Sequence, residues 1–164
     1  MITLRKATVD DLEEITEIYN EAIINTTATF DTQPKNLEEQ KLWFQSHQPN
    51  YPILVAQQGK LIVGWSSLSK WSDRCAYIGT AEASIYIRKD CRGKGIGSQL
   101  LRALLREGKD MELHTVIARI AGNNNASMHL FESEDFQRIG VMKEVGRKFG
   151  DLIDVCLMQK IYKK

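Results

Sequence analysis

The sequence predicts an α/β (α+β) fold in which a mixed central sheet of about seven strands carries helices on both faces. Segments with strand character and segments with helical spacing are interleaved along the chain, and the strands predominate in its middle. No Ser-rich or Pro-rich linker and no internal repeat interrupts the 164 residues. The composition, 43% hydrophobic and 26% charged, is that of an ordinary globular protein. We therefore expect one domain over residues 1–164.

The chain opens with a short strand and a helix. Residues 2–6 alternate in polarity as a strand does. Thr8 and Asp11 have the spacing of a helix cap pair. After them, apolar residues recur at helical spacing: Leu12, Ile15, Ile18, Tyr19, Ala22 and Ile23. This stripe predicts a helix that packs one face against the core.

A polar stretch over residues 25–35 separates this helix from the next. Asn36 and Glu39 have the spacing of a capping box, and an apolar group follows within one turn: Leu42, Trp43 and Phe44. A second helix is therefore expected here. Residues 53–57 and 61–68 then have strand character, and the glycine-containing turn between them predicts a hairpin.

The second half of the chain alternates strands with helices. After a strand at 81–88, apolar residues at helical spacing predict a helix to about residue 109: Leu100, Leu101, Leu104 and Leu105. Beyond it we expect a buried strand at 114–120, a short helix at 126–134, and strands at 136–142 and 153–161.

A glycine-rich turn joins the strand at 81–88 to the helix that follows, with the sequence Arg92-Gly93-Lys94-Gly95-Ile96-Gly97-Ser98. Glycines at alternate positions let the backbone turn tightly and leave its N–H groups unshielded by side chains. The start of a helix adds unpaired N–H donors and a partial positive charge of about +0.5. Because Arg92 and Lys94 add further charge, the sequence predicts a pyrophosphate site here.

The spacing of the glycines separates this turn from two common phosphate loops. A dinucleotide fingerprint needs G-x-G-x-x-G early in the fold, and the nucleotide-triphosphate loop needs G-x-x-x-x-G-K-[ST]. Neither pattern occurs here. The chain instead has R-x-x-G-x-G at Arg92, Gly95 and Gly97. A purely structural turn is the alternative that remains open.

That spacing and the order of elements resemble the GNAT N-acetyltransferases, and the resemblance extends over essentially the whole chain. A closer likeness, to the branch with phosphinothricin and methionine-sulfoximine N-acetyltransferases, rests on three stretches: 18–23 with 27–30, 80–87, and 144–150 with Asp154. The resemblance implies the GNAT fold, acetyl-coenzyme A (acetyl-CoA) as co-substrate, and a homodimer.

The resemblance also implies a reaction. The acetyl group of acetyl-CoA would move to the α-amino group of a small amino-acid-like acceptor of the phosphinothricin, methionine sulfoximine or methionine sulfone type. Two alternatives stay open. The acceptor could be a peptide N-terminus or a polyamine, or the chain could be a non-catalytic regulator that binds acyl-CoA.

Cofactor contacts are assigned by the same resemblance. The strand before the turn would bind the pantetheine arm, the turn itself the pyrophosphate, and an asparagine would touch the cofactor: Ile85, Tyr86, Ile87, Arg92, Gly93, Lys94, Gly95, Ile96, Gly97, Ser98 and Asn124. For Asn124 a second interpretation is equally good, because Asn123-Asn124-Asn125 is also typical of a turn and helix cap.

Glu82 is the candidate general base, the role proposed for the matching glutamate in the branch that the chain resembles. An α-amino group has a pKa of about 7.7–8.0 and is mostly protonated at neutral pH, so a base assists its attack. Glutamate is depleted in strands, yet Glu82 lies in one between Ala81 and Ala83. A solvated carboxylate at a strand end is the alternative.

One motif departs from the family pattern. A Tyr or His that can protonate the departing thiolate usually precedes Glu-x-x-Gly-Phe, but here Phe131 occupies that position and Asp135 replaces the glycine. Phe131 cannot donate a proton. His129 lies two residues away and should face elsewhere on a helix. A dedicated general acid is therefore not predicted.

Acceptor binding is assigned to four residues. Arg74, in a loop eight residues before Glu82, is the candidate clamp for an acceptor carboxylate, because a guanidinium matches a carboxylate with two hydrogen bonds. Phe30 and Phe149 are candidate walls of the pocket, and Lys148 is a candidate partner for an anionic group. A solvated arginine and aromatic core packing are the alternatives.

Charge and composition narrow the partners. A formal net charge of +1 gives no global field for nucleic acid or a membrane surface. No apolar run approaches the roughly 20 residues that span a bilayer, and the N-terminus lacks the apolar core of a signal peptide. The three cysteines and three histidines show no metal-ligand spacing. We expect a cytoplasmic protein with free thiols, no metal and a small-molecule amine as its partner.

Overall fold

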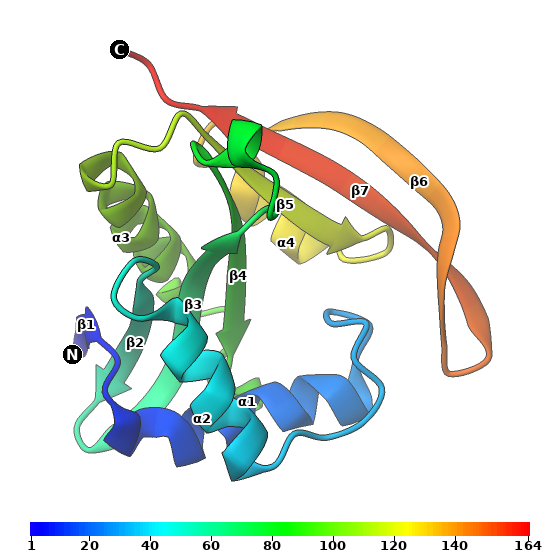
Figure 1. Cartoon of the computed structure of the whole chain (residues 1–164). Coiled ribbons are helices and arrows are strands. Elements are labelled where there is room, and N and C mark those ends of the chain that lie inside the picture. The colour runs from blue at the N-terminus through cyan, green and yellow to red at the C-terminus, as the bar shows by residue number, and fades with distance from the viewer.

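The computed structural model describes residues 1–164, and its seven strands form one mixed sheet in the order β1-β2-β3-β4-β5-β7-β6 (Figure 1). The strands are β1 (Ile2–Lys6), β2 (Ile53–Gln58), β3 (Leu61–Lys70), β4 (Thr80–Ile87), β5 (Thr115–Ala121), β6 (Gln137–Lys148) and β7 (Asp151–Ile161). The helices are α1 (Leu12–Asn25), α2 (Leu37–His47), α3 (Ile96–Asp110) and α4 (Asn125–Glu132). The predicted fold class is confirmed. None of the helices has the length and apolarity needed to cross a membrane.

Both predicted helix starts have the capping interactions that the sequence indicates. Asp11 accepts a hydrogen bond from the Thr8 N–H at 2.7 Å, which caps a short 3-10 turn leading into α1. At α2 the box closes in both directions, since Glu39 N–H donates to Asn36 and Asn36 N–H donates to Glu39, each at 2.9 Å. These caps satisfy backbone N–H groups that have no partner inside a helix.

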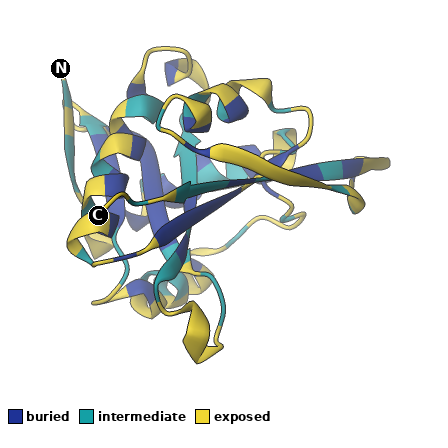
Figure 2. Ribbon diagram, turned by 90° about the horizontal axis from the view of Figure 1, so that it is seen from above, coloured by how far each residue is buried: buried dark blue, intermediate teal, exposed yellow.

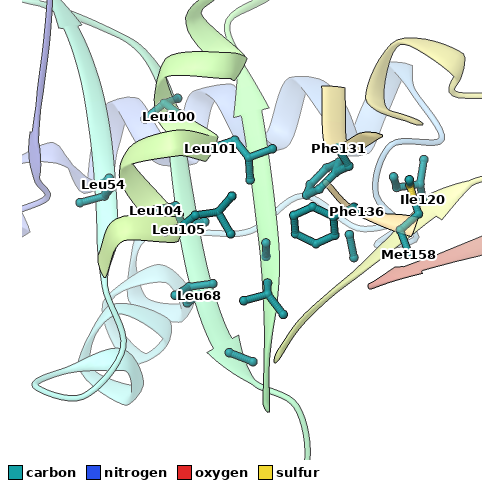
Figure 3. Close-up of a cluster of buried hydrophobic side chains, with 14 of the residues drawn as sticks. Leu54, Leu68, Leu100, Leu101, Leu104, Leu105, Ile120, Phe131, Phe136 and Met158 are labelled. Carbon is teal, nitrogen blue, oxygen red and sulfur yellow. The ribbon is translucent and has the colours of Figure 1, made fainter. Parts of the chain in front are cut away.

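Two hydrophobic cores lie on opposite faces of the sheet. The larger one packs α3 and α4 against the strands, and Leu100, Leu101 and Leu104 of α3 are completely buried in it (Figure 3). The smaller one packs α1 against β2 and β3. Helices thus cover both faces, as the sequence predicts.

The sheet splits between its two central strands. β4 and β5 are the parallel pair, and their ladder has three register pairs: Thr80 with Thr115, Ala81 with Val116, and Glu82 with Ile117. Both strands then continue without pairing to each other, β4 to Ile87 and β5 to Ala121. Backbone groups on one side of β4 therefore stay free beyond Glu82, and the opening between the strands positions the site described below.

The last two strands form a long hairpin that projects from the rest of the molecule (Figures 1 and 2). The sequence predicts a strand over 136–142, which is too short, because β6 continues to Lys148. The pairing register shifts between Met142 and Gly146, and Glu144 within that stretch has a positive φ of 50°. This irregularity breaks the alternation of polarity on which strand prediction depends.

Candidate active site

Two cavities meet where β4 and β5 separate. The first, of about 720 Å³, lies against the glycine-rich turn, and we call it the turn cavity. The second, of about 430 Å³, lies against Glu82 and the face of the sheet, and we call it the sheet cavity. They share part of their walls: Thr27, Ala28, Ile85, Tyr86, Asn124, Ser127 and Phe131. A molecule that occupies one cavity can therefore reach into the other.

The glycines of the turn cavity are required by the backbone. Gly93 and Gly95 have φ values of +74° and +80°, in the left-handed region that favours glycine, and no atom lies within 4 Å of where a Cβ would stand. At Gly97 close packing favours glycine instead, because a Cβ there would lie 3.2 Å from the Leu130 side chain of α4. The turn thus presents bare backbone and the N-terminus of α3 to the cavity, as an anion site requires.

The two cations of the turn are placed differently. Arg92 lines the turn cavity, where its guanidinium donates to the Ile87 carbonyl at 3.1 Å and to the Glu21 carboxylate at 2.6 Å. Lys94 is exposed and donates to the Asp90 carbonyl at 3.0 Å, outside the lining of the cavity. All the predicted cofactor residues except Lys94 therefore gather around this cavity.

Asn124 has a defined structural role. It is the N-cap of α4, and its side-chain oxygen accepts from the Ser127 N–H at 3.1 Å. The helix-cap interpretation is thus confirmed. Asn124 also lines both cavities, and its amide nitrogen makes no hydrogen bond within the chain, so its other end stays free for a ligand.

Glu82 lies in the sheet cavity at the last register pair of β4 with β5. Arg119 of β5 grips its carboxylate with two hydrogen bonds, from Nε at 2.5 Å and from Nη2 at 2.7 Å. These bonds raise the pKa of Arg119, and its guanidinium also lies over the Trp71 ring, 5.6 Å from the ring centre. Sequence reasoning missed Arg119. The feature of the sequence that could have indicated it is a single charged residue inside an otherwise apolar strand.

Two tyrosines line the sheet cavity: Tyr86, which was predicted as a cofactor contact, and Tyr19, which was not predicted as a site residue. The Tyr19 hydroxyl donates to Asp31 and lies 3.0 Å from the Thr29 hydroxyl. Tyr86 lies edge-on to Tyr19, with ring centres 5.1 Å apart, and lines both cavities. Burial raises the pKa of Tyr19 above its ordinary value and raises the pKa of Tyr86 to about 12. Both phenols are therefore neutral at physiological pH.

Phe131 occupies the position at which the resembled family usually has a Tyr or His. Phe131 is buried, packs edge-to-face on Phe136 at 4.9 Å, and lines both cavities. Asp135, in place of the usual glycine, has a φ of +67°. This is the left-handed region that favours glycine, so a glycine would fit the position without strain.

The predicted acceptor residues are only partly brought together. Phe30 lines the sheet cavity, whereas Phe149 lines the turn cavity. Lys148 is buried, donates to the Thr29 carbonyl at 2.8 Å, and lines neither cavity; burial lowers its pKa. Arg74 lies exposed in the loop after β3 and also lines neither cavity.

The family model and two relatives that match this sequence are described as acetyltransferases. A model of the acetyltransferase (GNAT) domain matches residues 1–137. The L-methionine sulfoximine/L-methionine sulfone acetyltransferase of Pseudomonas aeruginosa is 40% identical over 159 residues, which cover 96% of this chain and 92% of that protein. The phosphinothricin N-acetyltransferase of Streptomyces coelicolor is 32% identical over 163 residues, covering 97% and 95%.

Solved structures agree in fold. A phosphinothricin acetyltransferase from Sinorhizobium meliloti in complex with acetyl-CoA superposes with a TM-score of 0.95 at 36% identity, covering 98% of this chain and 88% of that one. An acetyltransferase from Salmonella typhimurium with its cofactor acetyl-CoA has a TM-score of 0.97 at 32% identity, covering 100% and 95%.

Proposed function

The chain belongs to the acetyltransferase (GNAT) family, and we propose that it transfers the acetyl group of acetyl-CoA to the α-amino group of a small amino-acid-like acceptor. Acceptors of the methionine sulfone, methionine sulfoximine and phosphinothricin type are the ones we propose. One observation carries this proposal: where β4 and β5 separate, the turn cavity, with its bare glycine backbone, shares walls with the sheet cavity that Glu82 lines. We further propose that residues 1–164 act as a single domain.

The residues around the turn cavity fit acetyl-CoA. Open space over Gly93 and Gly95 lets a pyrophosphate approach the backbone, and Arg92 adds positive charge at the same place. The free edge of β4 offers backbone groups to an amide-containing arm such as pantetheine. Bound acetyl-CoA supplies an activated acetyl group, and the chain's own residues position the amine that receives it.

The proton of the amine is assigned to Glu82. As the acceptor nitrogen forms its bond to the acetyl carbon and the carbon–sulfur bond breaks, Glu82 takes a proton from the nitrogen, directly or through water. An N–H on the free edge of β4 stabilises the charge that develops on the acetyl oxygen. Phe131 has no proton to give, so the departing sulfur takes its proton from water or from the amine itself.

The experiment that tests this function is an acceptor screen with acetyl-CoA. Release of free thiol and the mass of the product are followed for methionine sulfone, methionine sulfoximine, phosphinothricin, spermidine and a short peptide. We expect acetylation of the three amino-acid compounds. Acetylation of spermidine or the peptide alone would overturn the assignment of the acceptor, and no thiol release with any amine would overturn the assignment as an enzyme.

Two copies of the chain are proposed to pair through the β6–β7 hairpin. β6 is the last strand of the sheet, so one edge of it has no strand partner, and apolar side chains of the hairpin are about half exposed: Ile139, Val141, Val145 and Leu152. A second copy that covers this arm would remove these side chains from water. Sedimentation velocity should give twice the mass of 18.7 kDa, and a single-chain mass over micromolar concentrations would contradict pairing.

The place of action is proposed to be the cytoplasm. Cys75, Cys91 and Cys156 are free thiols, and two of them, Cys91 and Cys156, are buried. Unpaired cysteines are typical of a reducing compartment.

A further inference from the structure

Three neighbouring segments bring a carboxylate, a guanidinium and an indole ring together, and the carboxylate and the guanidinium line the sheet cavity. Glu82 comes from β4, Arg119 from β5 and Trp71 from the loop that follows β3. Glu82 pairs in register with Ile117, and Arg119 lies two residues further along β5, so the side chains of Ile117 and Arg119 share a face. The fold therefore positions Arg119 against Glu82 through the strand register.

Arg119 has hydrogen-bonding capacity to spare. A guanidinium carries five N–H donors. Two of those in Arg119 bind Glu82, and the remaining three have no partner within the chain. Its side chain is 54% exposed and lines the sheet cavity. Trp71 covers one face of the guanidinium, so the unused donors at its edge are held in a defined orientation.

The charges around the sheet cavity make Arg119 distinctive. Among the residues that line it, two carry carboxylates, Glu82 and Asp31, and Arg119 is the one cation. The Asp31 carboxylate is occupied by the Tyr19 hydroxyl. An anionic group that enters this cavity therefore meets a single positive charge, at Arg119. Arg74 and Lys148, the cations that the sequence suggests, lie outside the lining.

We propose that Arg119 binds the carboxylate of the acceptor, so that the Glu82–Arg119 pair recognises the head group of an amino acid. This inference rests on the proposed function and names its specificity residue. The amino and carboxylate groups of an α-amino acid are attached to the same carbon. The protein therefore needs two adjacent side chains to bind them, one that accepts hydrogen bonds from the amino group and one that donates to the carboxylate. Glu82 and Arg119 are such a pair. A polyamine or a simple amine has no group for the free edge of the guanidinium.

Matched acceptors test this assignment. Methionine sulfone is compared with its decarboxylated amine, using the unchanged protein, Arg119→Gln, Arg119→Lys, and Arg74→Gln as a control. We expect Arg119→Gln to raise the Michaelis constant for methionine sulfone about tenfold or more, as loss of a charged hydrogen bond does. The Michaelis constant for the decarboxylated amine should change less than about twofold. Arg119→Lys should recover part of the loss for methionine sulfone, and Arg74→Gln should leave the preference for methionine sulfone over the amine intact.

A binding measurement separates failure of this assignment from failure of the proposed function. Calorimetry with methionine sulfone, on protein saturated with coenzyme A, needs no turnover. Weaker binding by Arg119→Gln, with no acetylation by the unchanged protein, would support carboxylate recognition and reject the reaction.

Two results would overturn the role of Arg119. Equal losses for both acceptors, together with a shifted pH profile of turnover, would show that Arg119 acts only by holding Glu82. A selective loss in Arg74→Gln, with none in Arg119→Gln, would assign the carboxylate to Arg74. Circular dichroism and thermal melts of each variant confirm that the fold is retained.

Discussion

The turn cavity and the sheet cavity are built in opposite ways. The turn cavity takes its bare backbone from one contiguous stretch, residues 92–98, where the glycines have positive φ or allow close packing. The sheet cavity takes side chains from segments far apart in the chain, among them Phe30, Glu82 and Arg119. A short motif can thus specify the part of the site that binds a common cofactor, whereas tertiary packing builds the part that selects the acceptor.

The two cavities also use different chemistry. Backbone N–H groups and a helix N-terminus bind an anion through fixed dipoles, which no single side-chain change removes. The sheet cavity depends on ionisable side chains, and each can be replaced separately. Variants in the sheet cavity should therefore change turnover and acceptor preference, and variants in the turn should change cofactor affinity.

The largest expected effect belongs to Glu82 in the sheet cavity. Glu82→Gln keeps the shape of the side chain and loses its basicity, so turnover at neutral pH should fall by about 10²-fold or more. Steady-state kinetics from pH 6 to 9 measures the fall, and calorimetry should show nearly unchanged affinity for acetyl-CoA.

Asp31→Asn is the matched control, because Asp31 is the other carboxylate of the sheet cavity. It should keep most of the turnover. If Asp31→Asn loses as much as Glu82→Gln, or if Glu82→Gln retains full turnover across the pH range, Glu82 is not the base.

Gly95 provides the next largest effect, in the turn cavity. A valine there must adopt the left-handed backbone, at a cost of about 1–2 kcal/mol, and its side chain would stand in the open space of the anion site. Affinity for acetyl-CoA should fall about tenfold or more. Gly59→Val is the matched control, because Gly59 also has a positive φ, of +62°, with open space around it.

Both glycine variants should therefore lose similar stability, and only Gly95→Val should lose cofactor affinity. Thermal melts and calorimetry measure the two quantities separately. Equal affinity in the two variants would remove the glycine turn from the cofactor site.

The difference between the cavities also explains what the sequence could predict. The helix starts at Thr8 and Asn36 and the glycine turn depend on neighbours within a few residues, and all are present in the structure. The partnership of Arg119 with Glu82 joins residues 37 positions apart and follows from strand register. The register of β4 against β5 cannot be read from a sequence when it is not known which strands pair. Lys94 and Arg74 show the same limit, since type and spacing do not reveal which way a side chain points.

A smaller effect is expected where the hairpin supports the sheet cavity. A Cβ on Gly146 of β6 would overlap the ring of Phe30, which lines that cavity. Gly146→Ala should therefore displace Phe30 and raise the Michaelis constant for the acceptor about three- to tenfold, with acetyl-CoA affinity unchanged.

Gly140→Ala is the control from the same strand, because no atom lies within 4 Å of the place that its Cβ would take. Gly140→Ala should leave both the Michaelis constant for the acceptor and the affinity for acetyl-CoA unchanged. A loss of cofactor affinity in Gly146→Ala would contradict the separation of the two cavities.

The smallest expected effect is a loss of folding stability in acid, which depends on His47 of α2. His47 is buried at the end of α2, where one ring nitrogen lies 2.8 Å from the Trp43 carbonyl oxygen and the other 3.0 Å from the Ser69 hydroxyl of β3. Burial lowers the pKa of His47, so the folded state favours the neutral ring. In the unfolded chain the ring takes up its proton near the ordinary value of about 6.5. The contribution of His47 to stability is therefore constant above about pH 6.5 and is lost as the pH drops below it, towards the lowered pKa of the folded state.

Urea midpoints measured from pH 7.5 to 5 should show this decline in the unchanged protein. His47→Gln keeps hydrogen-bonding capacity without titrating in this range, so the decline should become shallower even if the variant is less stable at every pH. His129→Gln is the matched control, since His129 is exposed on α4 and should leave the slope as it was. An equally steep decline in His47→Gln would mean that the acid-sensitive group lies elsewhere, and the link between α2 and β3 would then not depend on a neutral imidazole.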